Sequence, residues 1–261
     1  MNLNSSLILI TGASSGIGAA TAKAAARTGP ALAALAAEIR AAGGQAWACA
    51  ADLADPPQVA QMAVQAAREA GLPDILIHCA GAGRWLFTEE TSAAEAAEMM
   101  AAPYFTAFYT TRAFLPAMLA RGSGQIVVIN SPASRAAWPG ATGYTAARWA
   151  LRGFTQALRA DLHGTGLTVT SVVPGRVLSP YFDHNPGTLE RGPRIARLIP
   201  NLTTEQAAAG VLWATAHNRR EHVMPGMLRV FYALHTLAPG LMEGLLVRTG
   251  WQRPARGSEA A

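Results

Sequence analysis

The chain has 261 residues, of which 51% are hydrophobic and 14% are charged, so it is large enough to bury a substantial core. This composition excludes an intrinsically disordered protein. The formal net charge of +5 indicates a basic surface. No block of basic residues with interleaved aromatics occurs, so we expect no nucleic-acid partner.

The two cysteines, Cys49 and Cys79, lack the spacing of a metal site, and no metal is expected. Both cysteines are expected to be small core residues. Their small number is consistent with a reducing compartment. The first apolar run lies too close to Met1 to leave room for a secretory leader. We therefore expect a cytoplasmic protein.

The first elements predict a strand at residues 7–10, a glycine-rich turn at 11–18 and a helix at 19–27. The turn reads Thr-Gly-Ala-Ser-Ser-Gly-Ile-Gly. Gly12, Gly16 and Gly18 would let the chain turn tightly and let a pyrophosphate approach the backbone. The start of the following helix would add free N–H groups and the positive end of its dipole. This order predicts a nucleotide-binding loop.

Residues 31–42 predict a second helix where a doubly wound fold places its second strand. That strand normally carries the acidic or basic residue that reads the cofactor ribose. Either the protein lacks the strand, or a stretch is absent from the sequence. A Cα–Cα distance of roughly 3.8 Å between residues 30 and 31 would indicate a true junction.

Strand-like and helix-like runs alternate along the rest of the chain, which favours a parallel sheet covered on both faces. We predict an α/β, three-layer Rossmann fold with a doubly wound parallel sheet that lacks its second strand. Further strands are expected at 46–50, 75–78, 125–129, 168–173 and 222–224, and helices at 58–70, 93–119, 144–163 and 204–218. Residues 1–252 form one domain, with a substrate loop at 178–202, an apolar helical segment at 225–251 and a disordered tail at 253–261.

The residues that suggest chemistry follow the strand at 125–129. Asn130-Ser131 comes directly after this strand, and Tyr144 opens a helix with Arg148 one turn further on the same face. A guanidinium beside a phenol favours its ionised form, and such a tyrosine can exchange a proton with an alcohol or carbonyl oxygen. Ser131 could give that oxygen a second hydrogen bond. Taken alone, these residues also fit a capped helix with a buried tyrosine.

Six segments in order resemble the short-chain dehydrogenase/reductase family over about residues 7 to 225. They are Thr11–Gly18, Asp52-Leu53, His78–Gly81, Ser131, Tyr144–Arg148 and Pro174-Gly175. The resemblance implies a nicotinamide cofactor and reversible hydride transfer between an alcohol and a ketone. It also implies a homo-oligomer.

The resemblance further implies roles for single residues. Tyr144 would be the acid/base, Ser131 would orient the carbonyl, and Arg148 completes the catalytic set. Asp52 would contact the adenine. The implied cofactor-binding residues are Gly12, Ser14, Ser15, Gly16, Ile17, Gly18, Asp52, Leu53, Ala80, Gly81, Tyr144, Arg148, Pro174, Gly175 and Val177.

Three positions depart from the family pattern. Arg148 replaces the usual lysine and does not readily relay a proton. Pro103 stands where an asparagine usually supports a water, and His78 replaces the first asparagine of an Asn-Asn-Ala-Gly segment. They leave open a second hypothesis, a dinucleotide-binding scaffold or sensor with impaired catalysis. The cofactor is NADP or NAD, and the basic surface leans slightly toward NADP.

Aromatic residues in the loops above the strand ends suggest a pocket for a hydrophobic alcohol or ketone. These are Trp85, Trp138, Tyr181 and Phe182, which fit core or lid packing equally well. The segment 178–202 is rich in proline, glycine and arginine, which is typical of a mobile substrate loop.

The segment 225–251 is apolar but is interrupted by charged residues, Arg229 and Arg248 among them, and by Pro239-Gly240. It is too short and too interrupted for a transmembrane helix. Two interpretations stay open. Its helices close the substrate pocket or a subunit interface, or they make a peripheral membrane contact in which arginines meet anionic headgroups.

Overall fold

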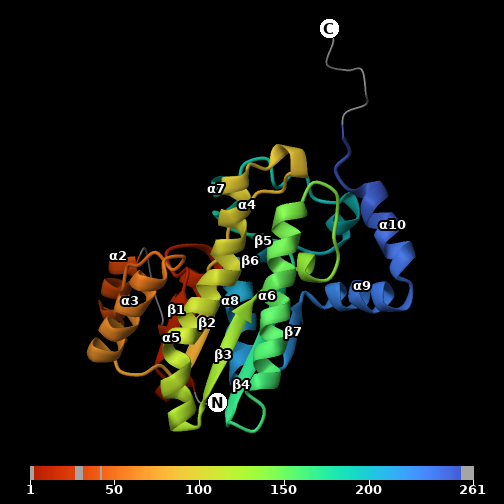
Figure 1. Ribbon diagram of the computed structural model, residues 1–261. Coiled ribbons are helices and arrows are strands. Elements are labelled where there is room, and N and C mark those ends of the chain that lie inside the picture. The colour runs from red at the N-terminus through yellow and green to blue at the C-terminus, as the bar shows by residue number, and fades with distance from the viewer. Residues whose placement is uncertain (1–2, 27–31, 42, 254–261) are drawn as a thin grey trace.

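The computed structural model describes residues 3–26, 32–41 and 43–253. These residues form three layers, a five-stranded parallel sheet with helices on both faces (Figure 1). The sheet contains, in spatial order, β1 (Ile8–Thr11), β2 (Ile75–His78), β3 (Gly124–Ile129), β4 (Leu167–Pro174) and β7 (Glu221–Met224). The predicted three-layer α/β fold with a doubly wound parallel sheet is confirmed.

The central strands are apolar on both faces because both faces are covered. Ile77 of β2 pairs with Ile10 of β1 on one side and with Val127 of β3 on the other. Neighbouring residues of one strand point to opposite faces. Leu76 therefore packs into one core cluster and Ile77 into the other.

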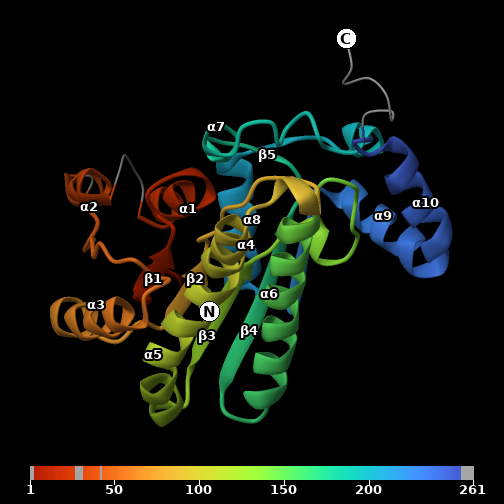
Figure 2. The same cartoon turned by 45° about the horizontal axis from the view of Figure 1, so that its top comes forward.

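One face of the sheet is covered by α1 (Gly16–Ala26) and α8 (Thr204–Ala216), which contact each other. The other face is covered by α3 (Pro56–Glu69), α5 (Thr106–Arg121) and α6 (Thr142–Asp161) (Figure 2). Several short elements lie in the loops. They are α7 (Tyr181–His184), the strands β5 (Val177–Leu178) and β6 (Leu202–Thr203), and 3-10 turns at Leu3–Ser5, Thr88–Glu90, Pro132–Ser134 and Arg194–Leu198.

The strand expected at 46–50 does not form, and that prediction was wrong. The neighbouring helix α2 (Leu32–Ala41) packs Leu35 and Ile39 against Ala13, with Ala46 at the same cluster. Residues 44–50 run beside this cluster without joining the sheet, so β1 is an edge strand. No strand occurs between α1 and α3 in the described stretches 32–41 and 43–55. The junction of residues 30 and 31 lies outside the described residues.

The single helix expected at 93–119 is interrupted. It consists of α4 (Ala93–Met100) and α5, joined by a π-helical turn at Ala101–Phe105. Pro103 explains the interruption, because proline has no N–H for the carbonyl four residues before it and its ring crowds that carbonyl. The turn widens the helix at this point.

The apolar segment 225–251 contains α9 (Gly226–Leu237) and α10 (Pro239–Thr249). The two helices are bent by 120° to each other and stand out beyond β7 (Figure 1). Among the helices that the structure describes, none is long and apolar enough by itself to cross a membrane, although this bent pair passes the same test jointly. Arg253, expected to begin a disordered tail, is ion-paired with Glu89 at 2.9 Å. Residues 254–261 lie outside the described part.

Candidate active site

A cavity of about 490 Å³ lies at the carboxyl ends of the central strands. The loops after β1, β2, β3 and β4 all contribute to its lining. Ligands of open α/β sheets bind at this edge. Every predicted site residue lines the cavity except Asp52 and Leu53.

The glycine-rich loop forms one end of the cavity. Gly12 and Gly16 have φ of +66° and +54°, a region that favours glycine. A Cβ on Gly18 would lie 2.2 Å from the carbonyl oxygen of Gly12, so the loop folds tightly onto the start of α1. A Cβ on Gly12 would lie 2.7 Å from the nitrogen of Ala80. The loop can therefore approach its neighbours this closely only with glycine at these positions.

The start of α1 suits an anion. Its first turn carries no acidic side chain, and Ser14 and Ser15 just before it are exposed at the cavity. The nearest atoms to a Cβ on Gly16 would be those of Ser179 at 3.8 Å, which leaves open space above the turn. A diphosphate fits this arrangement of open space, free amides and helix dipole.

Tyr144 and Arg148 lie on one edge of α6 at the cavity. Both side chains are buried, with 6% and 7% exposed. The Arg148 guanidinium carbon lies 5.0 Å from the centre of the Tyr144 ring, and Nη1 donates to the carbonyl of Ile129 at 3.4 Å. Its Nε is buried and has no hydrogen-bond partner among the described residues. A positive charge is thus held against the phenol ring.

Ser131 follows Asn130 at the end of β3 and is buried beside the cavity. Its Oγ accepts a hydrogen bond from the N–H of Ala133 at 3.3 Å, which leaves its own O–H available to donate. Asn130 connects Ser131 to α6. The Asn130 side chain accepts from the N–H of Ser131 at 2.9 Å and donates to the carbonyl of Arg148 at 3.2 Å.

A second phenol, that of Tyr181, neighbours Tyr144. Its hydroxyl donates to the carbonyl of Gly83. Burial and the neighbouring Tyr144 raise the pKa of Tyr181 above its usual range, while Arg148 opposes this effect. Tyr181 therefore stays protonated. The sequence suggested only a wall residue, because nothing in the spacing of α6 and α7 indicates that the two phenols meet.

The predicted aromatic residues gather at the other end of the cavity. The ring centres of Trp85 and Trp138 are 5.1 Å apart, and those of Trp85 and Tyr144 are 5.9 Å apart. Phe182 also lines the cavity. This apolar cluster lies directly against the phenol that would meet a substrate oxygen.

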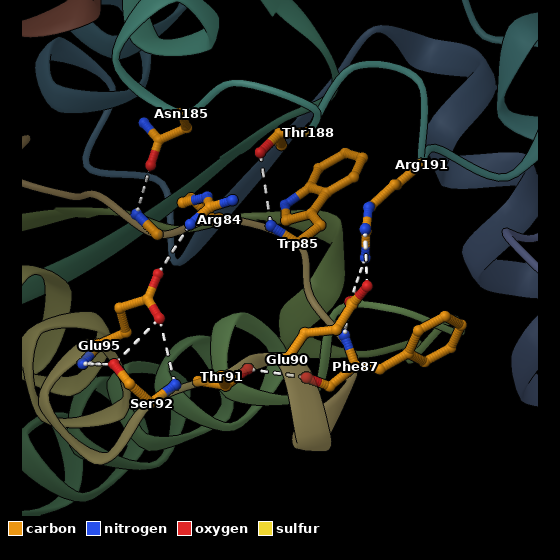
Figure 3. A network of polar contacts seen from close by, with 11 residues as sticks. Arg84, Trp85, Phe87, Glu90, Thr91, Ser92, Glu95, Asn185, Thr188 and Arg191 are labelled. Atoms are coloured by element: carbon orange, nitrogen blue, oxygen red, sulfur yellow. Dashed lines mark hydrogen bonds and ion pairs between the residues drawn. The ribbon is translucent and has the colours of Figure 1, made fainter. Parts of the chain in front are cut away.

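The segment 178–202 is tied to the loop after β2, as Figure 3 shows. Asn185 Oδ1 accepts from the N–H of Gly83 at 3.1 Å, and Thr188 Oγ1 accepts from the N–H of Trp85 at 3.4 Å. Further along, Arg191 pairs with Glu90, and this guanidinium holds the pKa of Glu90 down at about 2. The segment expected as a mobile loop therefore has buried anchors, for which no sequence pattern exists.

The structure also locates the departures from the family pattern. His78 is 3% exposed, with Nε2 3.0 Å from Thr111 Oγ1, and burial lowers its pKa to about 4. Pro103 is buried away from the cavity, whereas its neighbour Ala102 lines it. Asp52 is exposed, and its Oδ1 accepts from the N–H of Ala54 at 2.9 Å. Its contact with an adenine stays a prediction.

The C-terminal helices complete the cavity, which the sequence left open as one of two interpretations. Their contributions are Leu228, Phe231, Tyr232 and His235 from α9, and Met242 and Leu246 from α10.

Known proteins resemble this chain in sequence and in fold. The family model "short chain dehydrogenase" matches residues 6–187. Glycine betaine reductase of Emericella nidulans is 36% identical over 183 residues, 66% of this chain but 14% of that protein. D-threitol dehydrogenase of Mycolicibacterium smegmatis is 33% identical over 229 residues, 82% of this chain and 87% of that protein.

A solved short-chain dehydrogenase/reductase from Burkholderia phymatum, in complex with NAD, has a TM-score of 0.80. It is 24% identical, and the match covers 97% of this chain and 99% of that one. This likeness concerns the fold. With the family model matching most of its length, the chain belongs to the short-chain dehydrogenase family.

Proposed function

We propose that the protein is an NAD(P)-dependent oxidoreductase that transfers hydride reversibly between nicotinamide and a hydrophobic alcohol or ketone. The observation that carries this proposal is the meeting of Ser131, Tyr144 and Arg148 in one cavity with the glycine-rich loop. The named relatives are reductases and dehydrogenases, which supports the same class of reaction.

The residues at the polar end fit a nicotinamide dinucleotide. The turn at 12–18 and the start of α1 would hold the diphosphate, and Arg148 could donate hydrogen bonds to ribose hydroxyls. Pro174, Gly175 and Val177, which line the cavity after β4, would border the nicotinamide. When bound there, the cofactor would supply or accept the hydride. Its use in a relative supports this assignment, since a 25% identical alcohol dehydrogenase from Thermococcus sibiricus was solved with 5-hydroxy-NADP.

The chain's own residues would handle the proton and the substrate oxygen. Tyr144 Oη would give a proton to the oxygen during ketone reduction and take one during alcohol oxidation. Ser131 Oγ would donate a hydrogen bond to the same oxygen as its negative charge grows. Arg148 would keep a positive charge beside the phenol throughout, since guanidinium does not lose its proton. Trp85 and Trp138 would exclude water from the reacting atoms.

The test is turnover of a panel of apolar ketones and alcohols by the purified protein, with NADP and NAD, reduced and oxidised. We expect absorbance changes of the nicotinamide with at least one substrate and their loss in Tyr144→Phe. Arg148→Lys separates this proposal from a scaffold with impaired catalysis. A strong rise in turnover at unchanged cofactor affinity would favour the scaffold.

A further inference from the structure

The outer side of the C-terminal helix pair is apolar and uncovered. Leu237 and Leu241, which flank the bend at Ala238, are 82% and 65% exposed. They belong to a set that we call the outer apolar face. It consists of Met227, Val230, Leu234, Leu237, Leu241 and Val247, each at least 45% exposed. On α9 the spacing of these residues is three, four and three, so they form one stripe along the helix.

The inner side of the same helices is apolar as well, and it is covered. Leu228 of α9 and Met242 of α10 are 3% and 5% exposed and line the cavity that contains Tyr144. A helix with apolar residues on two sides normally buries both of them. In the described residues only the inner side of this pair has a partner, so the outer apolar face needs another one.

The charges and the shape of the pair favour one kind of partner. Gly226–Thr249 contains two arginines, Arg229 and Arg248, and one carboxylate, Glu243, which lies 3.9 Å from His235 of α9. The Arg229 guanidinium donates to the carbonyl of Val223 at 2.9 Å, whereas Arg248 is exposed on α10. The pair projects from the edge of the molecule in both views, and Figure 1 shows it beyond β7 (Figures 1 and 2). A protein interface of standard size uses about 20–30 residues a side. Here the exposed set has six apolar side chains, of which Leu234, Leu237 and Leu241 lie within about one helical turn of the bend, which suits insertion into a lipid surface.

We propose that the outer apolar face docks α9 and α10 into the surface of a bilayer rich in anionic phospholipid. Arg248 would meet the headgroups, and the apolar side chains would enter the boundary with the acyl chains. The pair lies in the surface and does not span it. Because its inner side lines the cavity, an apolar substrate dissolved in the bilayer reaches Tyr144 past these helices. This last step rests on the proposed oxidoreductase function, whereas the docking itself does not.

The test is flotation of the full chain, without cofactor or substrate, on vesicles of phosphatidylcholine mixed with phosphatidylglycerol and on vesicles of phosphatidylcholine alone. We expect the wild type to float with the mixed vesicles and less with the neutral ones. Leu237→Glu combined with Leu241→Glu should lower the bound fraction at least about tenfold, since carboxylates enter lipid poorly. Val64→Glu is the matched control. Val64 is 71% exposed on α3, at the opposite edge of the sheet, and its variant should float like the wild type.

Three outcomes would overturn the docking. The first is a wild type that floats with neither vesicle, and the second is a double variant that floats as well as the wild type. The third is a Val64→Glu variant whose bound fraction falls as much as that of the double variant. Sedimentation without lipid measures the oligomeric state and so tests the rival partner, a second copy of this chain. If the wild type is a dimer that the double variant dissociates and neither binds vesicles, the face is a subunit interface.

Activity keeps the two proposals apart, because Leu237 and Leu241 do not line the cavity. The double variant should turn over a water-soluble ketone at the wild-type rate. It should be slower than the wild type only with a ketone dissolved in vesicles. A wild type that floats but never oxidises or reduces any substrate would refute the oxidoreductase and leave the docking standing. Turnover without flotation would do the reverse.

Discussion

The two ends of the cavity are built in different ways. The polar end comes from short, contiguous segments at the strand ends, where backbone atoms approach too closely for any side chain, as at Gly18. The apolar end is assembled from Trp85, Trp138, Tyr181 and the helices α9 and α10, which are far apart in the sequence. The first end is defined by backbone geometry and the second by side-chain packing. Substitutions at the polar end should therefore abolish chemistry, and those at the apolar end should change substrate affinity.

The largest expected effect separates the two phenols that share the cavity. Tyr144→Phe removes the proposed proton donor, and we expect kcat/KM to fall by at least about 10²-fold. Tyr181→Phe removes the hydrogen bond to the carbonyl of Gly83 and the hydroxyl that neighbours Tyr144, and it should cost less than about tenfold. Steady-state kinetics of both variants provides the measurement. Equal losses in the two would contradict the assignment of Tyr144 as the acid/base.

Gly18→Ala tests the backbone geometry of the polar end. The new Cβ would lie 2.2 Å from the carbonyl oxygen of Gly12, so the loop must open. We expect the dissociation constant of the cofactor to rise by about 10–100-fold, as measured by fluorescence titration. Gly153→Ala in α6 is the control, since nothing lies within 4 Å of its added Cβ. Unchanged cofactor affinity in Gly18→Ala would contradict the proposal that this loop binds the diphosphate.

The polar end should also make stability depend on pH through His78. Burial lowers its pKa from 6.5 to about 4, so the unfolded chain binds the proton more tightly than the folded one. This contribution to the free energy of unfolding is fully present above pH 6.5. It is lost as the pH falls toward 4, and the loss is roughly 3 kcal/mol in total. Urea unfolding across this pH range should show that His78→Asn loses less free energy of unfolding on acidification than the wild type. The exposed His163→Asn should keep the wild-type slope, and an equal slope in all three proteins would exclude His78 as the cause.

The smallest effect is expected at the apolar end. Trp138→Ala opens the wall beside Trp85, and we expect KM for an apolar ketone to rise about tenfold with kcat changed little. Trp149→Ala is the control, because Trp149 is half exposed on α6 and lies outside the cavity lining. A fall in kcat without a change in KM would show that Trp138 serves the chemistry and not substrate binding.

This contrast also explains what could be predicted from the sequence. The turn at 11–18 and the pair Tyr144–Arg148 depend on local spacing, and local spacing is what a sequence displays. The prediction of a strand at 46–50 failed because a strand needs a neighbour to pair with, and α2 packs beside β1 instead. The hydroxyl of Tyr181 and the anchors at Asn185 and Thr188 depend on contacts across about 100 residues, which no local pattern reveals.

Transfer of deuterium tests the central claim most directly. The wild type would be incubated with an apolar ketone and reduced nicotinamide cofactor that carries deuterium at the transferable position of its ring. The account predicts an alcohol with deuterium on the former carbonyl carbon, and no such product from Tyr144→Phe in the same time. An alcohol without deuterium, or equal label from the variant, would contradict hydride transfer at the site formed by Ser131, Tyr144 and Arg148.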